Sequence, residues 1–239
     1  MNKERAEEYF LECERVWVFW ALMFVGGYYG GYTYNIRGGV FANAQTANLL
    51  LLAMNLGKGN FGEAVYYLIP FTAYFSGIVI SEVLAKEIKR FQALRWDTLL
   101  VGVELLAVLL LGLLPAEAPD QICQVSLNFL CAMQFNTFRQ AEGIGMATTF
   151  CTNHLRQFGS FFVRYLRSRE RSVLRKFVLH GSMLLLFMLG VVAATLGCRF
   201  AGYRSIWGAG LVLLFVFLRL LYADRTYERD LLQKTPHGH

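Results

Sequence analysis

Long apolar segments separated by short polar stretches constrain this chain more than any other feature of its sequence. The apolar segments cover residues 16–34, 40–56, 64–84, 98–114, 122–139, 147–162, 178–196 and 206–222. Their lengths approach the ~20 residues with which an α-helix crosses the hydrocarbon core of a bilayer. Only 17% of the residues are charged, whereas a soluble domain has about 25%. The sequence therefore predicts an all-α polytopic membrane protein with a single membrane domain over residues 16–222.

The stretch from Met133 to Asn153 is polar although it lies deep within this apolar chain. Amides, hydroxyls and charges are costly in hydrocarbon unless they face a partner, a cavity or water. Gly143 and Gly145 interrupt a continuous helix, so we expect one helix to end, a short unwound turn, and a shorter helix from Ala147. A weaker copy of the pattern lies 105 residues earlier, where Gly38, Ala42, Asn48 and Leu50 correspond to Gly143, Ala147, Asn153 and Leu155.

Two groups of residues carry a resemblance to a known family. The later group is Met133-Gln134-x-Asn136, Arg139 and Ala147-Thr148-Thr149-x-x-Thr152-Asn153, and the earlier group is Gly38-Gly39-Val40-Phe41-x-x-x-x-Thr46-Ala47-Asn48. Together they resemble the two signatures of the YoaK family of bacterial membrane proteins, and the resemblance covers residues 17–222. That family is a domain of unknown function. The resemblance therefore implies a six-helix membrane fold and supplies no activity.

The distribution of Lys and Arg sets the expected topology. If all the apolar segments crossed the membrane, the two most basic loops, at 86–95 and after Phe162, would lie outside. If 40–56 and 147–162 are instead re-entrant half-helices, 19 of the 23 basic residues lie inside, in accord with the positive-inside rule. We therefore expect a multi-pass protein of the bacterial inner membrane with both termini in the cytoplasm. Residues 1–15 form a polar leader and residues 223–239 a frayed polar tail.

This topology makes the two halves of the membrane domain inverted repeats. Repeat one covers residues 16–114 and repeat two covers residues 119–222, each with three transmembrane helices and one re-entrant half-helix. Because three crossings precede the second half, that half begins on the opposite side of the membrane. Inverted repeats with discontinuous helices are typical of secondary transporters, whose solute site lies near the midplane. This inference is an analogy of fold.

The starts of the two half-helices are the candidate solute site. A helix that starts at mid-membrane presents free N–H groups and a positive dipole end, which suit an anion. Helical spacing places Thr149, Thr152, Asn153 and Arg156 on one face, and Gln45 and Asn48 on another. The candidate substrate-binding residues are Gln45, Asn48, Gln134, Asn136, Arg139, Thr149, Thr152 and Asn153. The alternative is that these side chains only join helices, through hydrogen bonds worth about 1 kcal/mol or less each.

Glu104 is the candidate proton-coupling residue, because an isolated carboxylate among leucines and valines favours its neutral form. The alternatives are a neutral structural acid or an ion-pair partner for Arg139 or Arg37. Arg139 has its own alternative to solute contact, which is a local ion pair with Glu142 three residues later. We expect His180 to lie in the membrane interface.

The sequence argues against an enzyme, because it contains no HExxH, no GxSxG and no Walker-type loop. Its five cysteines form no metal-binding spacing, so we expect no cofactor and no metal. The basic stretch from Arg164 to Lys176 suits anionic lipid rather than nucleic acid. The expected partners are the lipid bilayer and a small polar or anionic solute, and a homo-oligomer stays open. The expected function is a secondary transporter or channel for that solute. The alternative is a non-transporting membrane scaffold or sensor.

Overall fold

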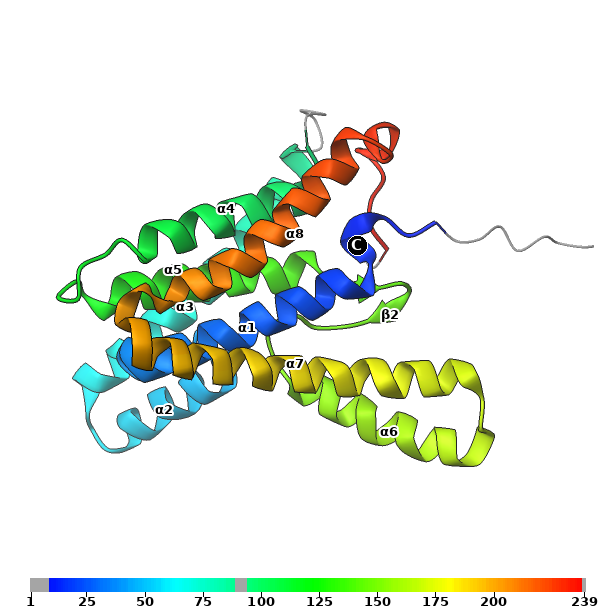
Figure 1. Cartoon of the computed structure of the whole chain (residues 1–239). Coiled ribbons are helices and arrows are strands. Elements are labelled where there is room, and N and C mark those ends of the chain that lie inside the picture. Colours follow the sequence, from blue (N-terminus) through cyan, green and yellow to red (C-terminus); the bar gives the residue numbers. More distant parts are fainter. Residues whose placement is uncertain (1–8, 89–93, 238–239) are drawn as a thin grey trace, which may run out of the picture.

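The computed structural model describes residues 9–88 and 94–237. Within these ranges the chain forms eight α-helices (Figure 1). They are α1 (Val16–Ile36), α2 (Gln45–Gly57), α3 (Phe61–Ile88), α4 (Trp96–Leu111), α5 (Asp120–Thr137), α6 (Thr152–Ser168), α7 (Arg171–Ala201) and α8 (Trp207–Arg225). The expected all-α class is confirmed. Residues 1–8 of the leader, and Lys89 and Arg90 of the basic loop, lie outside the described residues.

Three pairs of long helices build the bundle. α1 packs most extensively on α7, α3 on α5, and α4 on α8. The remaining two helices are added at the side, α2 on α3 and α6 on α7. α2 runs toward one end of the bundle and α6 toward the opposite end (Figure 1). Between α5 and α6 the chain forms a small antiparallel hairpin of β1 (Gln140–Ala141) and β2 (Ile144–Gly145).

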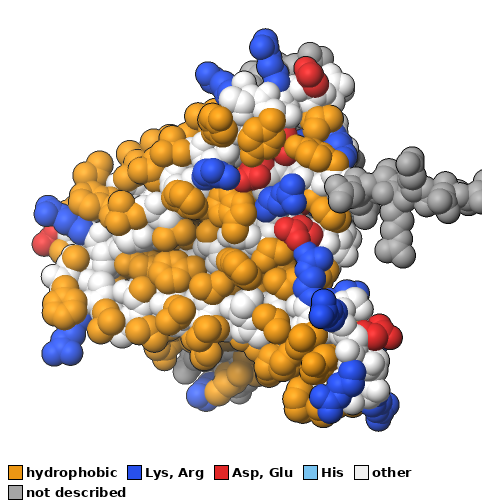
Figure 2. Space-filling view, turned by 45° about the vertical axis from the view of Figure 1, so that its right-hand side comes forward, with side chains coloured by type: hydrophobic (Ala, Val, Ile, Leu, Met, Phe, Trp, Pro, Cys, Tyr) orange, Lys and Arg blue, Asp and Glu red, His pale blue; other side chains and the backbone are white. Residues whose placement is uncertain are grey.

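Two stretches of the described chain are long and apolar enough to cross a membrane. One covers residues 61–85 in α3, and the other covers residues 171–225, which contain α7, the 3-10 helix η3 (Gly202–Ile206) and α8. Hydrophobic side chains cover most of the middle of the face in Figure 2, and many Lys and Arg lie at its two ends. α7 has 31 residues, which is about 46 Å at 1.5 Å per residue. It therefore exceeds the ~30 Å of a hydrocarbon core, and its first turns project together with the end of α6 (Figure 1).

α1 occupies the centre of the bundle because its glycines let neighbouring segments reach its backbone. On one face, a Cβ at Gly26 would lie 2.6 Å from the carbonyl oxygen of Thr148, and one at Gly30 would lie 2.7 Å from the side-chain oxygen of Asn43. On another face, the next glycine in the sequence, Gly27, lies against the backbone of α7. Small residues permit such close approach between membrane helices. The glycine-rich part of α1 is thus a continuous helix with neighbours on two sides.

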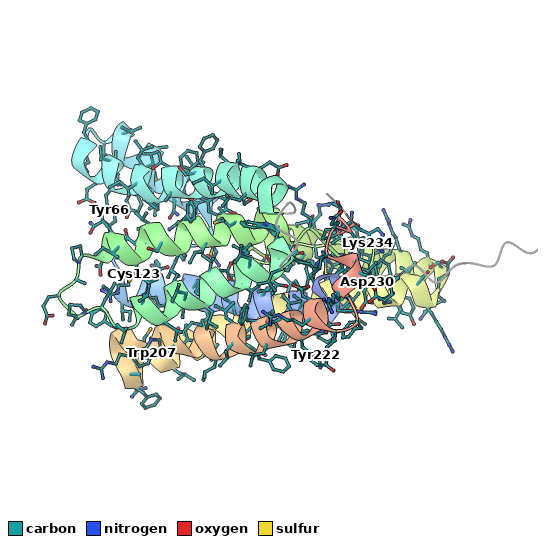
Figure 3. All side chains as sticks on the ribbon, turned by 90° about the horizontal axis from the view of Figure 1, so that it is seen from above. Tyr66, Cys123, Trp207, Tyr222, Asp230 and Lys234 are labelled. Atoms are coloured by element: carbon teal, nitrogen blue, oxygen red, sulfur yellow. The ribbon has the colours of Figure 1, made fainter. Side chains whose placement is uncertain are left out.

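The described part of the tail is held against the N-terminal segment, so the expectation of a frayed tail is wrong. The ring of His237 lies 2.7 Å from the buried carboxylate of Glu14. The ammonium of Lys234 donates to the backbone carbonyl of Tyr9 over 2.9 Å. Figure 3 shows Lys234 at this end of the bundle and Tyr66 at the opposite end. The two described ends of the chain therefore lie side by side.

Candidate functional site

The first break of the chain, residues 37–44 between α1 and α2, turns back along α1. Asn43 donates from Nδ2 to the carbonyl of Gly26 over 2.8 Å. Gly26 is the eleventh of the 21 residues of α1, so it marks the midpoint of that helix. The chain thus returns halfway along α1 before α2 begins.

Asn48 closes this first break from the first turns of α2. Its Nδ2 donates to the carbonyl of Phe41 over 2.8 Å, and its Oδ1 accepts the backbone N–H of Phe41 over 3.4 Å. The next backbone N–H, of Ala42, donates to the hydroxyl of Thr33 over 3.3 Å. Asn48 is fully buried, so these bonds satisfy backbone groups that water does not reach. The side chain of Asn48 therefore stabilises the loop of the first break through these hydrogen bonds.

Side chains on the neighbouring helices secure the flanks of the first break. Gln45 donates from Nε2 to Oδ1 of Asn128 over 2.5 Å and so joins α2 to α5. The fully buried guanidinium of Arg37 lies 3.5 Å from Asp120 and 4.1 Å from the centre of the Tyr203 ring. One nitrogen of Arg37, Nη2, has no hydrogen-bond partner among the described residues. The sequence left open an ion pair between Arg37 and Glu104. Arg37 pairs with Asp120 instead, so that alternative is wrong.

The second break, between α5 and α6, is longer and contains the hairpin. Its turn residues Glu142 and Gly143 have φ of 45° and 75°, a left-handed conformation that glycine adopts readily and glutamate rarely. The turn is fixed at both sides, because the Glu142 N–H donates to the carbonyl of Glu14 over 2.9 Å and the Glu142 carboxylate pairs with Arg175. The local pair of Glu142 with Arg139 that the sequence left open is therefore not formed.

After the hairpin, residues 146–151 return to the midpoint of α1, as the first break does. The carbonyl oxygen of Thr148 packs against Gly26, and Nε2 of Gln134 donates to that same oxygen over 3.4 Å. Gly26 also accepts the hydrogen bond from Asn43. The two breaks, 105 residues apart in the sequence (Asn43 and Thr148), therefore meet at one glycine.

α6 begins at Thr152, five residues later than the start expected at Ala147. Thr149 lies in the loop before the helix, so it shares no helical face with Thr152 and Asn153. Thr152 is exposed, and Asn153 is partly exposed and accepts a hydrogen bond from Arg156 over 3.0 Å. The predicted polar face of this half-helix therefore loses Thr149 and keeps Thr152, Asn153 and Arg156. The polar groups that reach the midpoint of α1 are those of the loop.

His154 holds the second break in the way that Asn48 holds the first. The Nε2 atom of His154 lies 2.8 Å from the carbonyl oxygen of Ala147 and 3.3 Å from its backbone nitrogen. Each of the two side chains therefore contacts both the N–H and the C=O of the residue seven positions earlier. The counterpart of Asn48 is thus His154, at an offset of 106 residues, and not Asn153 as the sequence comparison predicted.

His154 in turn contacts His180 of α7. Their Nδ1 atoms lie 3.0 Å apart, and both side chains are buried. The ring of Phe161 stacks on His180 with a centroid distance of 5.7 Å and an interplanar angle of 5°. The ring of His180 is enclosed between α6 and α7, and its expected depth in the membrane interface stays a prediction. Sequence analysis missed this pair because neither histidine belongs to a motif.

Several buried polar atoms at the second break lack a hydrogen-bond partner among the described residues. They are both carboxyl oxygens of Glu104, the hydroxyls of Tyr29, Thr148 and Thr149, and Oε1 of Gln134. All five side chains are fully buried, and we call them the central polar cluster. They come from α1, α4, α5 and the returning loop. Buried polar groups are usually hydrogen-bonded, so a concentration of unpaired ones requires an explanation.

Contacts between the members place this cluster around the midpoint of α1. Tyr29 follows Gly26 by about one helical turn. Its hydroxyl lies close enough to the carboxyl group of Glu104 for the two to interact electrostatically. Cys131 of α5 is a neighbour of both and precedes Gln134 by about one turn. The hydroxyl of Tyr74 approaches Thr149, in a geometry that leaves the Thr149 hydroxyl without a hydrogen bond.

Two other predicted site residues lie at an ion pair between α3 and α5. Arg139 donates to the carboxylate of Glu82 over 3.0 Å and to the side-chain oxygen of Asn136 over 2.8 Å. Asn136 also donates to Ser81 over 2.6 Å. Arg139 thus pairs with Glu82 and not with Glu104. Asn136 and Arg139 therefore bond to each other and to Ser81 and Glu82 of α3, and not to members of the central polar cluster.

Two hollows of the described surface lie elsewhere and share Trp207. One, of about 570 Å³, is bordered by the α4–α5 loop and η3, and the other, of about 450 Å³, follows α4 and α8. Figure 3 shows Trp207 near the start of α8, at the end of the bundle that also contains Tyr66. The central polar cluster, by contrast, is enclosed by helices.

Comparison with known proteins identifies one family. The family model described as "Protein of unknown function (DUF1275)" matches residues 18–219. That match covers most of the chain and includes both breaks, the two histidines and the central polar cluster. No curated protein and no solved structure matches this chain.

Proposed function

We propose a transport function for this chain, which belongs to the DUF1275 family and is a helical membrane protein. The proposal is a secondary transporter or channel for a small polar or anionic solute. The observation that carries it is the central polar cluster, whose buried oxygens have no hydrogen-bond partner in the described part of the chain and lie near the point where both chain breaks meet. Helix packing alone does not require such unpaired groups, and they are costly in a membrane interior.

The proposed architecture is two inverted repeats of three crossings and one re-entrant half-helix each. Three observations support it. The two breaks reach the same midpoint residue, Gly26. Asn48 and His154 make the same contact to the residue seven positions earlier. α2 and α6 run toward opposite ends of the bundle (Figure 1).

The proposed site consists of the returning loop together with its neighbours on α1, α4 and α5. The hydroxyls of Thr148 and Thr149 and the amide of Gln134 would bind the solute, and Glu104 would supply proton coupling. In the conformation described here the site is closed, because each of these side chains is fully buried. Transport would therefore require that the helices around the loop separate, which is the general behaviour of alternating access.

The proposed topology places both termini in the cytoplasm and residues 115–121 outside. It is supported by the contact between the described ends of the chain. Cysteine-accessibility labelling in intact cells tests it, with Arg90→Cys expected to be protected and Glu117→Cys expected to react. Labelling of Arg90→Cys from the periplasm would contradict the re-entrant arrangement.

A thermal-shift screen of small anions and neutral polar solutes on the purified protein tests the function. A solute that binds the folded protein raises its melting temperature. The expected result is a solute-dependent rise that Thr149→Val removes and that Asn136→Leu, at the Arg139–Glu82 ion pair, retains. A rise that persists in Thr149→Val and is lost in Asn136→Leu would place the site at the Arg139–Glu82 pair instead.

A further inference from the structure

The contact between His154 and His180 restricts where hydrogens can lie. Their Nδ1 atoms are 3.0 Å apart, which is hydrogen-bond distance. A hydrogen bond needs a hydrogen on one of these nitrogens and a free lone pair on the other. The two rings therefore share one hydrogen, and which ring carries it depends on the far side of His154.

The far side of His154 accommodates both tautomers of the ring. If Nε2 carries the hydrogen, it donates to the carbonyl oxygen of Ala147 over 2.8 Å, and Nδ1 accepts from His180. If Nδ1 carries the hydrogen, it donates to His180, and Nε2 accepts the backbone N–H of Ala147 over 3.3 Å. The same backbone residue thus offers a donor and an acceptor to one nitrogen. Both tautomers keep two hydrogen bonds.

The pair also accommodates one additional hydrogen without losing a contact. A doubly protonated His154 donates from Nε2 to Ala147 and from Nδ1 to a neutral His180. A second additional hydrogen would place two N–H groups against each other across 3.0 Å. It would also place two positive rings 5.2 Å apart, which weakens binding of the second proton on the order of a hundredfold at an effective dielectric of ~20.

We propose that His154 and His180 form a proton-binding site that takes up a single proton and passes it between the ring of His180 on α7 and the ring of His154, whose Nε2 faces the loop of residues 146–151. The first break contains the matched comparison within the same chain. There Asn48 makes the same contact to the residue seven positions earlier, with an amide that holds no additional proton. The titratable ring of His154 occurs at the second break, whose residues Thr148 and Thr149 belong to the central polar cluster.

The groups around the pair are positive or neutral. Arg156 of α6 and Lys176 of α7 act on His180, and Arg164 of α6 faces the Phe161 ring that covers it. The returning loop contributes the thiol of Cys151, and the part of α1 from residue 16 to residue 27 has no titratable side chain. The bound proton therefore has no fixed carboxylate partner in these elements.

This arrangement specifies the solute class, a step that rests on the proposed transport function. A proton on the pair puts one positive charge next to Ala147, two residues from the hydroxyl of Thr149. An anion bound at Thr148 and Thr149 would offset that charge. We therefore assign a monoanion that binds together with one proton, so that the charges of the two cancel.

Nitrogen NMR of histidine-labelled protein in detergent micelles tests the proton site directly. The chain has four histidines, and His154→Asn and His180→Asn assign the buried pair. On lowering the pH from about 8 to about 3, a range that extends well below the one in which an exposed histidine ordinarily titrates, the rings of the pair should change together at one midpoint. The pair should take up one proton. Independent titration of the two rings, or no titration of either, would overturn the proposal.

His154→Asn is also the decisive variant, because it retains the contact seen at Asn48 while removing the additional proton. Its melting temperature should lie close to that of the unaltered protein, below it only by the loss of the His180 contact, and its proton uptake should fall by one per chain. Uptake equal to that of the unaltered protein would overturn the proposal. Should His154→Asn fail to fold, His180→Asn provides the same measurement from the other ring.

Solute binding separates this inference from the transport proposal. Calorimetry of acetate and of other small monoanions, in two buffers of different ionisation enthalpy, counts the protons that accompany binding. About one proton should accompany the anion in the unaltered protein, and none in His154→Asn. Anion binding without proton uptake would overturn the monoanion assignment and leave transport standing. A titrating pair with no binding of any solute would overturn transport and leave the proton site standing.

Discussion

The two breaks of the chain reach the same glycine of α1 but satisfy their polar groups differently. At the first break, Asn48 pairs with both backbone groups of Phe41, and Thr33 accepts the next N–H. At the second, one nitrogen of His154 serves both backbone groups of Ala147, and the hydroxyls of Thr148 and Thr149 have no partner among the described residues. At the first break the loop backbone is satisfied and the unpaired group is Nη2 of Arg37, where the break begins, whereas the loop of the second break itself retains two unpaired hydroxyls.

This difference distinguishes polar groups that stabilise the fold from polar groups that are free to bind a ligand. A buried group that is fully hydrogen-bonded stabilises the fold and has nothing left to offer a solute. A buried group without a partner weakens the fold unless some other state of the protein uses it. Composition alone does not separate these two kinds of polar group: residues 37–44 contain one amide, Asn43, and residues 138–151 contain Gln140, Thr148 and Thr149. The hydrogen bonds distinguish them.

The largest expected effect is at Asn48. Asn48→Leu leaves the N–H and C=O of Phe41 buried and unpaired, so the free energy of unfolding should fall by about 3 kcal/mol. The matched control is Asn153→Leu, because Asn153 is partly exposed and its side chain accepts a hydrogen bond from the exposed Arg156 on the same helix. It should change the stability by less than about 0.5 kcal/mol. Unfolding of both variants in mixed micelles measures the contrast, and equal losses would show that the counterpart of Asn48 was assigned wrongly.

His154 should have the next largest effect. His154→Leu removes a single hydrogen bond to Ala147, because Nε2 of His154 bonds either the N–H or the C=O of Ala147 but not both at once. The substitution also leaves His180 without its partner. The expected loss is about 2 kcal/mol. His154→Asn should restore most of it, since the amide can make both bonds as Asn48 does. If His154→Asn is as unstable as His154→Leu, the likeness between the two breaks does not extend to their energetics.

The arrangement of the helices was predictable to a large extent, since it follows from apolar length. α1, α3, α4, α5 and α8 begin and end within about four residues of the predicted segments. α7 is longer than predicted, because its basic first turns continue the helix beyond the apolar segment. The polar starts of residues 40–56 and 147–162 correctly marked the two breaks, although α2 and α6 each begin five residues later than predicted.

The details of the second break were not predictable from the residues alone. Glu142 adopts a positive φ, which its residue type does not favour, so Gly143 indicated a turn but the residue before it gave no local signal for a hairpin. The offset of 105 residues aligned Asn48 with Asn153 by residue type, whereas the backbone contacts align it with His154 at an offset of 106. The partners of Arg139 and Arg37 depend on which helices lie side by side, and that is a property of the whole bundle.

Paired threonine substitutions give a smaller effect, of opposite sign at the two breaks. Thr33→Val leaves the N–H of Ala42 unpaired and should destabilise the protein by about 1 kcal/mol. Thr149→Val replaces a buried hydroxyl that has no partner with a methyl group of the same shape. It should leave the stability unchanged or raise it by up to about 1 kcal/mol. Melting temperatures measure both, and a large loss in Thr149→Val would show that its hydroxyl is bonded in the folded protein.

Glu104 should give the smallest change in stability, and it tests which group controls the response to pH. Its carboxyl oxygens have no hydrogen-bond partner among the described residues, and no cation there acts on them. Glu104→Gln keeps the shape of the neutral side chain, so the free energy of unfolding should change by less than about 0.5 kcal/mol. Solute binding should persist, because the binding groups of the loop and of Gln134 are unaltered.

The pH dependence of uptake then separates Glu104 from the histidine pair. If Glu104 binds the coupled proton, Glu104→Gln should remove the pH dependence and His154→Asn should retain it. If the histidine pair binds it, as the two tautomers of His154 indicate, the outcome should be the reverse. The double variant should then behave like His154→Asn alone, because a single group controls the step. Loss of pH dependence only in the double variant would mean that either group alone can bind the coupled proton, so that neither the histidine pair nor Glu104 is the single controlling group.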